Sequence, residues 1–174
     1  IGKGGKEVWI QATYNPILDI NGAPSKVIKF ATDVTDRKLT TANHAGQIQA
    51  ISRSQAVIEF SIDGTILAAN QNFLQTMGYT LEEVVGKHHS MFVDASQKNS
   101  ADYRTFWRRL EQGDYIADEF QRVGKGGKEI WIQASYNPIL DLNGKPFKIV
   151  KFATDITQRK IEFTDYAGQI EAIG

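Results

Sequence analysis

An internal repeat constrains this 174-residue sequence more than any other feature. Residues 1–51 return as residues 123–173, shifted by 122 positions, and 34 of the 51 aligned pairs are identical because 17 differ. A repeat at domain-sized spacing marks an array of similar modules. The sequence therefore predicts one whole module together with the end of a preceding one, and we expect it to be a slice of a longer protein.

Composition places the chain among ordinary globular proteins and excludes several kinds of site. Twenty basic and twenty acidic residues cancel, so no basic surplus indicates a nucleic-acid or anionic-membrane partner. The sequence has no cysteine, which excludes disulfides, thiolate metal sites and cysteine nucleophiles. No apolar run approaches the roughly 20 residues that span a bilayer, and no signal peptide is visible. A cytoplasmic location is the default expectation.

Each copy of the repeat has the pattern of a β-hairpin. Residues 6–17 and 26–35 are rich in β-branched and aromatic residues, as strands are. Asn21-Gly22 lies between them and is a strong hairpin-turn signal, which returns as Asn143-Gly144. Residues 115–123 are expected to form the first strand of a three-stranded meander with the second copy.

Other local signals set the limits of these elements. Pro16 and Pro138 are expected to close their strands, because proline cannot donate a hydrogen bond to a ladder. Residues 36–55 predict a connecting helix with a narrow apolar stripe, and the same stripe returns after Thr157.

The segment between the two copies combines a short hairpin with several helices. Residues 57–62 and 65–69 predict the hairpin, residues 70–77 a short helix, and residues 102–112 a longer amphipathic helix. The order of elements predicts an α+β fold, in which a five-stranded antiparallel sheet has its helices on one side and connecting helices at both ends.

The motifs along this module also match those of a known family in order and spacing. They are Asp63-Gly64-Thr65, Asn70 to Tyr79, Glu83 to Gly86, Trp131, Pro138, Asn143-Gly144 and Asp155-Ile156-Thr157. Together they resemble a PAS domain. The stretches Gly86 to His89, Phe106-Trp107, Gly124 to Trp131 and Lys151 to Thr157 further resemble tandem PAS modules of bacterial methyl-accepting chemotaxis proteins.

The resemblance divides the chain into four segments. Residues 1–35 are the C-terminal hairpin of a truncated PAS module, and residues 36–55 are the connecting helix. Residues 56–157 are a complete PAS domain, and residues 158–174 are the outgoing signalling helix.

The resemblance implies a sensory signalling module and not an enzyme. We expect it to sense a small ligand or a redox or gas cue and to relay the signal through a helix to the signalling domain of a chemotaxis receptor. Two alternatives stay open: a ligand-free PAS module for dimerisation or spacing, and a PAS regulator of a histidine kinase or diguanylate cyclase. No serine–histidine–aspartate set, phosphate loop or metal-spaced carboxylate cluster is visible in the sequence.

The adjacent histidines His88 and His89 are the strongest candidates to bind a cofactor, because imidazole binds haem iron. They hold a metal only if haem is bound, and the alternative is a surface or capping pair. For this family, the absence of cysteine excludes photochemistry through a reactive cysteine, which leaves haem, a noncovalent flavin or no cofactor. The candidate pocket residues are His88, His89, Asn70, Phe73, Trp107, Ile132, Ala134 and Lys151.

Strand alternation places Lys151 and Trp131 on opposite faces of the predicted sheet. Lys151 falls on the pocket side, where a buried lysine is costly unless it is paired. Either it meets an anionic ligand or a carboxylate, or its amine extends past the sheet edge into solvent. Trp131 falls on the outer face, where it contacts a second subunit or is covered by the connecting helix of its own subunit.

The resemblance also assigns a signal junction, in which Asp155 and Thr157 in the second copy match Asp33 and Thr35 in the first. The carboxylate and the hydroxyl can hold backbone donors where a strand becomes a helix.

A lone two-stranded hairpin such as residues 1–35 is marginal in water. We therefore expect it to pack on the whole module or on another copy of the chain, with hairpin exchange as the sharper version. The predicted partner is a second copy, joined through the connecting helices and the outer sheet face. We expect no nucleic-acid partner and no membrane contact from this segment.

Overall fold

The chain forms two compact units, residues 1–50 and residues 51 onward, in a computed structural model that describes residues 1–171. The first unit holds a short 3₁₀ turn η1 (Lys3–Gly5), strands β1 (Ile10–Leu18) and β2 (Pro24–Asp33), and most of helix α1 (Thr35–Ser54). The two strands form a hairpin whose residues are almost all exposed.

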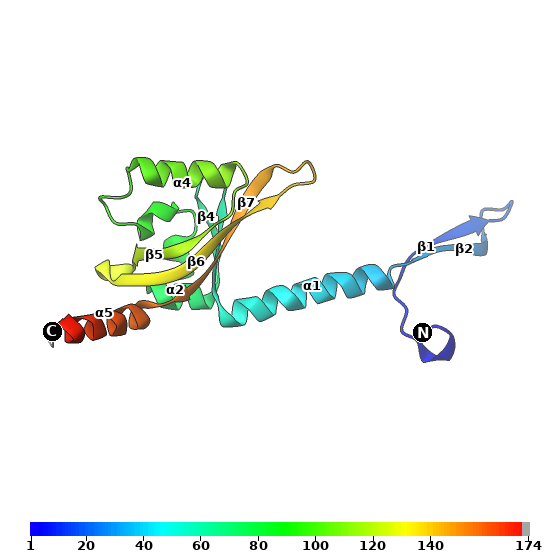
Figure 1. The fold of residues 1–174 in the computed structure, drawn as a ribbon. Coiled ribbons are helices and arrows are strands. Elements are labelled where there is room, and N and C mark those ends of the chain that lie inside the picture. The colour runs from blue at the N-terminus through cyan, green and yellow to red at the C-terminus, as the bar shows by residue number, and fades with distance from the viewer. Residues whose placement is uncertain (172–174) are drawn as a thin grey trace. The chain divides into compact units, whose positions relative to one another are not determined.

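The second unit is built on a five-stranded antiparallel sheet with the strand order β4-β3-β7-β6-β5. Figure 1 shows helix α4 along one side of this sheet and helix α5 leaving the end of β7. Its elements are β3 (Ala56–Ser61), β4 (Ile66–Ala69), α2 (Gln71–Met77), α3 (Leu81–Val84), η2 (His89–Phe92), α4 (Ala101–Glu111), β5 (Ile116–Val123), η3 (Lys125–Gly127), β6 (Glu129–Leu140), β7 (Pro146–Asp155) and α5 (Thr157–Glu171). The predicted α+β fold is confirmed.

The core of the second unit lies between the sheet and its helices. Alternate residues of each strand point inward, so Ile130, Ile132, Ala134 and Tyr136 of β6 are buried while Gln133 between them is exposed. Helix α4 contributes the apolar side of its amphipathic pattern, with Trp107 and Leu110 buried. The interior is unusually aromatic; its fully buried large side chains include Tyr136, Phe60, Phe73 and Phe92.

Local sequence alone builds the repeated hairpin twice with the same turn. In each copy one aspartate carboxylate, of Asp19 or Asp141, accepts hydrogen bonds from two backbone amides of the turn. The glycine that follows has a positive φ, 80° at Gly22 and 78° at Gly144, which only glycine adopts at little cost. The prediction of an Asn-Gly hairpin turn is confirmed in both copies.

The predicted start of the first strand is wrong, for a reason that lies in the neighbouring strand. The strand predicted from residue 6 begins only at Ile10, whereas its counterpart in the second copy begins at Glu129. There, residues 129–131 pair with the end of β5, and the first copy has no strand in that position.

The prolines do not close their strands either, since β1 and β6 run two residues past Pro16 and Pro138. Pro138 lies beyond the part of β6 that pairs with β5, because the last β6 residue in that pairing is Tyr136. The missing proline N–H therefore costs no ladder hydrogen bond on an open edge.

Candidate functional site

A fully buried histidine lies at the centre of the aromatic core. His89 begins η2 and is 0% exposed. Its Nδ1 lies 2.9 Å from the hydroxyl of Tyr103 on α4, and its Nε2 lies 3.0 Å from the hydroxyl of Tyr136 on β6. The imidazole thus bridges the helical layer and the sheet, and the two hydroxyls occupy both of its nitrogens.

Aromatic rings enclose this imidazole from several directions. Tyr103 and Phe106 stack against it, with interplanar angles of 15° and 20°, while other rings meet it edge-on. The edge-on rings are those of Phe60, Phe92, Trp107 and Tyr136. Such an enclosure excludes water, so every charge near His89 acts through a medium of low dielectric constant.

Two cationic side chains are buried beside the same tyrosine. Arg122 of β5 donates a hydrogen bond to the Tyr136 hydroxyl over 3.2 Å. Lys151 of β7 pairs directly with Tyr136 in the strand register, and its Nζ lies 4.8 Å from the centre of the tyrosine ring. Arg122 and Lys151 are only 6% and 1% exposed, and neither forms a salt bridge with any described residue.

Burial and these charges shift the protonation equilibria of the whole cluster. Burial, together with the charges of Lys151 and Arg122, holds the pKa of His89 well below 6.5, so the ring is neutral at pH 7. Burial also lowers the pKa of Lys151 and raises the pKa of Tyr103 to about 12. Burial acts to raise the pKa of Tyr136 as well, but the charges of Arg122 and Lys151 outweigh it and lower that pKa below 10.

The predicted pocket residues divide into three groups in the structure. Lys151 and His89 lie in this cluster, and Phe73, with the Lys151 amine 5.8 Å from its ring centre, lies beside it. Trp107, Ile132 and Ala134 belong to the surrounding core. The expectation that the Lys151 amine extends into solvent is wrong, because the strand pair places the amine between the rings of Phe73 and Tyr136.

His88 and Asn70 make structural hydrogen bonds outside the cluster. His88 caps η2 and lies near the surface, where its Nε2 is 2.9 Å from the carbonyl oxygen of Asp63. The side chain of Asn70 caps α2, and its amide binds four backbone groups, the N–H groups of Val57 and Phe73 and the carbonyls of Ser52 and Gln55. Both side chains are therefore already engaged by the backbone.

Sequence reasoning missed Arg122, Tyr103 and the hydroxyl of Tyr136 as site residues. Strand alternation puts Tyr136 on the same face of β6 as the candidates Ile132 and Ala134, but nothing in the sequence indicates that its hydroxyl contacts His89. The same period-2 rule applied to β5 would have placed Arg122 with Phe120 on the inner face. The contacts of Tyr103 depend on how α4 lies against the sheet, and no sequence signal gives that.

The residues around His89 do not fit a haem ligated by that histidine. Axial ligation needs a free imidazole nitrogen, and both nitrogens are held by tyrosine hydroxyls. The residues considered for a noncovalent flavin are engaged too, since Phe73 and Trp107 pack in the core and Asn70 binds the backbone.

The predicted junction connects β6 to the first turn of α5. Thr157 Oγ1 accepts a hydrogen bond from Trp131 N over 2.9 Å, while Asp155 Oδ1 accepts one from Thr157 N over 2.9 Å. Lys160 places its amine 4.9 Å from the centre of the Trp131 ring and forms an ion pair with Glu119 of β5. The helix of the same subunit thus covers part of Trp131, as one of the two expectations for that residue stated.

The first copy builds the same junction from its own residues. Thr35 Oγ1 accepts from Trp9 N over 2.9 Å, and Asp33 Oδ1 accepts from Thr35 N over 2.9 Å. The Lys38 amine lies 5.3 Å from the centre of the Trp9 ring, and the corresponding distance from Lys160 to Trp131 is 4.9 Å. The junction is therefore a property of the local sequence and forms without the rest of a module.

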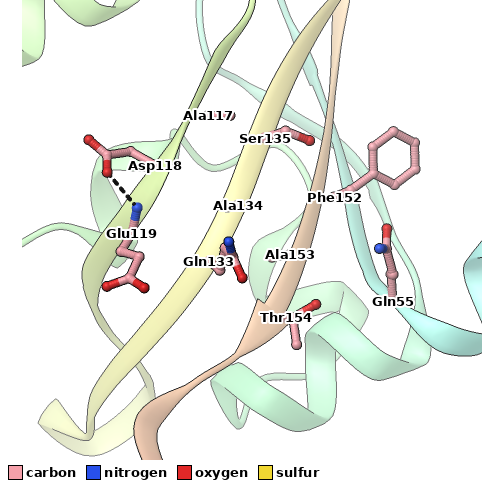
Figure 2. Close-up of a pocket in the computed structure, with 10 residues that line it drawn as sticks. All are labelled: Gln55, Ala117, Asp118, Glu119, Gln133, Ala134, Ser135, Phe152, Ala153 and Thr154. Atoms are coloured by element: carbon pink, nitrogen blue, oxygen red, sulfur yellow. Dashed lines mark hydrogen bonds between the residues drawn. The ribbon is translucent and has the colours of Figure 1, made fainter. Parts of the chain in front are cut away.

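The outer face of the sheet carries a shallow polar depression of about 470 Å³. Figure 2 shows Gln133 and Ser135 of β6 and Phe152 and Thr154 of β7 on this face, with Gln55 at its edge. The surface is open and contains one large apolar side chain, so it has the character of a contact surface more than that of a ligand pocket.

None of the helices that the structure describes combines the length and apolar character needed to cross a bilayer.

Comparison with known proteins gives consistent relatives. A family model described as PAS fold matches residues 52–161. The chain is 42% identical over 159 residues to the biofilm dispersion protein BdlA of Pseudomonas aeruginosa, covering 91% of this chain and 38% of that protein. It is 28% identical over 96 residues to the aerotaxis receptor of Escherichia coli, covering 55% of this chain and 19% of that protein. The chain spans less than two fifths of the length of either relative.

Solved structures share the fold at low sequence identity. The PAS domain of a protein from Colwellia psychrerythraea superposes with a TM-score of 0.57 and 20% identity, covering 66% of this chain and 97% of that chain. A light-oxygen-voltage domain studied with a flavin analogue gives a TM-score of 0.57 and 19% identity, covering 72% of this chain and 96% of that chain. At such identities the likeness is one of fold alone.

Proposed function

The chain belongs to the PAS family, and from that premise we propose that its second unit is a cytoplasmic sensory module of a bacterial chemotaxis-type receptor. The relatedness to BdlA and to an aerotaxis receptor supports a sensory role. The 122-residue repeat supports an arrangement of PAS modules in tandem, in which each module ends in the helix that leads to the next.

One observation carries the proposal: the interior cluster and the outgoing helix are attached to the same strand. Tyr136, on the inner face of β6, contacts His89 and Arg122. Trp131, five residues earlier on β6, holds Thr157 at the start of α5 through its backbone N–H. A ligand that alters the cluster thereby shifts β6, and the junction passes that shift to α5. In thermodynamic terms, the ligand shifts the equilibrium between two arrangements of the same structural element.

Replacing Thr157 by valine is expected to uncouple the helix from the sheet. The change removes the hydroxyl that accepts from Trp131 N and so costs about 1 kcal/mol at the helix start. The amide of Trp131 and those of the first turns of α5 should then exchange faster with deuterium, while those of β3 and of the rest of β6 keep their protection. In the intact receptor, signal output should no longer respond to the stimulus.

The repeat supplies a matched control for this experiment. Thr35→Val removes the equivalent bond to Trp9 in the first copy and should leave exchange in α5 unchanged. If Thr157→Val loosens α5 while the receptor still signals normally, the signal does not pass through this junction and the proposed relay is wrong.

A second function has its own support in the exposed surfaces. The open face shown in Figure 2 and the exposed β1–β2 hairpin both suit contact with another copy of the chain. In this case the module is a ligand-free spacer that dimerises through its connecting helices and outer sheet face, with or without hairpin exchange. Sedimentation of the purified chain distinguishes the two functions, since a spacer is dimeric at all times and independent of added ligand.

The output domain is a separate question, because a histidine kinase or a diguanylate cyclase could follow the same junction. The sequence beyond residue 174 of the parent gene decides among these outputs.

A further inference from the structure

Neither of the two buried cations of the second unit, Arg122 and Lys151, has a salt-bridge partner among the described residues. Burying a charge without a partner is costly, and proteins normally pair it with a carboxylate. Arg122 donates a hydrogen bond to the phenol of Tyr136 and the Lys151 amine lies 4.8 Å from the centre of the same ring, but no described acidic side chain forms a salt bridge with either. The site therefore has an excess of positive charge next to a neutral imidazole.

The guanidinium of Arg122 also has unused donors. Of its five N–H groups, one donates to the backbone carbonyl of Gln121 over 2.7 Å and one to the Tyr136 hydroxyl over 3.2 Å. Its Nε is buried and has no partner among the described residues. A guanidinium that keeps free N–H donors can bind a carboxylate through charge-assisted hydrogen bonds.

Arg122 is one of the residues that line a groove of the second unit. The groove has a volume of about 340 Å³ and lies between β5, the start of α4 and the loop that precedes α4. The lining residues that matter for binding are Ser100, Asp102, Phe106, Phe120 and Arg122. The volume falls within the range of small-molecule sites.

We propose that this groove binds a small monocarboxylate with an apolar body, whose carboxylate pairs with Arg122. The rings of Phe106 and Phe120 provide a wall against which a planar apolar group packs. Helix α4 begins at the groove with Ser100 as its N-cap, so the positive end of the helix dipole lies on the same side as the guanidinium.

The remaining charge in the groove selects against more highly charged anions. Asp102 is exposed on the first turn of α4 and lines the groove. Its carboxylate repels a second negative charge, so a dianion such as sulfate gains less from Arg122 than a monoanion does. An aromatic acid of the size of benzoate meets each of these requirements.

The sensory effect of this binding rests on the proposed function, whereas the binding itself does not. A carboxylate on Arg122 offsets the positive charge beside Tyr136, which in turn contacts His89. The ligand would thus act on β6, the strand that holds the start of α5.

The test is calorimetric titration of the full chain with benzoate, with benzamide as a neutral analogue and sulfate as the dianion. We expect benzoate to bind with a dissociation constant of about 1 mM or lower, with benzamide and sulfate at least about tenfold weaker. Arg122→Gln should weaken benzoate binding at least about tenfold, and Arg108→Gln, on the exposed side of α4, should leave it unchanged. Circular dichroism verifies that both variants are folded.

The outcomes separate binding from signalling. Equal binding of benzamide and benzoate, or no binding of benzoate, overturns the proposed site, and neither result depends on a variant that must fold. Benzoate binding that is lost in Arg122→Gln but has no effect on receptor output retains the site and contradicts the sensory function instead.

Discussion

Tyr136→Ala is expected to lower the free energy of unfolding of the second unit by about 3–5 kcal/mol, the usual loss for a large buried aromatic side chain. Tyr136 is 0% exposed and contacts the rings of Phe60, Phe106 and Phe120. Its hydroxyl also links His89 to Arg122, so the substitution leaves two buried polar groups without this partner. Urea unfolding followed by near-ultraviolet circular dichroism, which reports on packed aromatic rings, measures the loss.

Tyr14→Ala is the matched control, because Tyr14 occupies the same position in the first copy of the repeat. Tyr14 is 64% exposed in the hairpin, so its replacement should change stability by less than about 0.5 kcal/mol. A loss at Tyr14 as large as that at Tyr136 would contradict an exposed hairpin. It would instead support the proposal that the hairpin is buried by another copy of the chain.

Acidification is expected to destabilise the second unit before its carboxylates titrate. The folded unit keeps His89 neutral, with a pKa well below 6.5, whereas the unfolded chain protonates this histidine near pH 6.5. The unfolded state thus binds more protons, so stability is fully present above about pH 6.5 and falls by up to about 1.4 kcal/mol per pH unit below it. Stability should therefore decline as the pH falls from about 6.5 towards about 5, because the folded unit keeps His89 neutral.

The pH range in which stability is lost distinguishes the effect of His89 from that of the acidic groups of the same unit. The lowered pKa values of Asp63, Glu83 and Glu119 contribute stability that is lost only as the pH falls below about 4.5. The groups facing His89 are Tyr103 on α4, Arg122 on β5, Tyr136 on β6 and Lys151 on β7.

Substitutions at the two adjacent histidines assign this pH dependence to one of them. His89→Gln keeps an amide that bonds to the two tyrosines and should flatten the dependence between about pH 6.5 and pH 5. His88→Gln should preserve it, because His89 is still present. An unchanged slope in His89→Gln would show that another group carries the effect.

The order of elements and both repeated junctions could be predicted from the sequence because short-range chemistry decides them. The turn at Asn143-Gly144 needs one aspartate and one glycine with a positive φ, and the junction needs Asp155 and Thr157 two residues apart. Period-2 alternation separated the two faces of the strands that carry Lys151 and Ile132, and the PAS resemblance indicated which face lies inside.

The site could be predicted only in part, because its geometry depends on contacts between distant segments. His89 was a candidate from its residue type, but its partners Tyr103 and Tyr136 lie 14 and 47 residues away along the chain. The same separation explains why Lys151 was expected to extend into solvent: nothing local indicates that two aromatic rings will hold its amine.

The repeat shows most directly what the sequence determined by itself and what only the tertiary structure decided. Local sequence determined the turn, the register and the junction of the hairpin, which are the same in both copies. The tertiary structure decided where the strand begins, since residues 129–131 extend β6 only because β5 lies beside them. It also decided that Tyr136 is buried while Tyr14 is exposed, because burial depends on the helices and strands that cover a face.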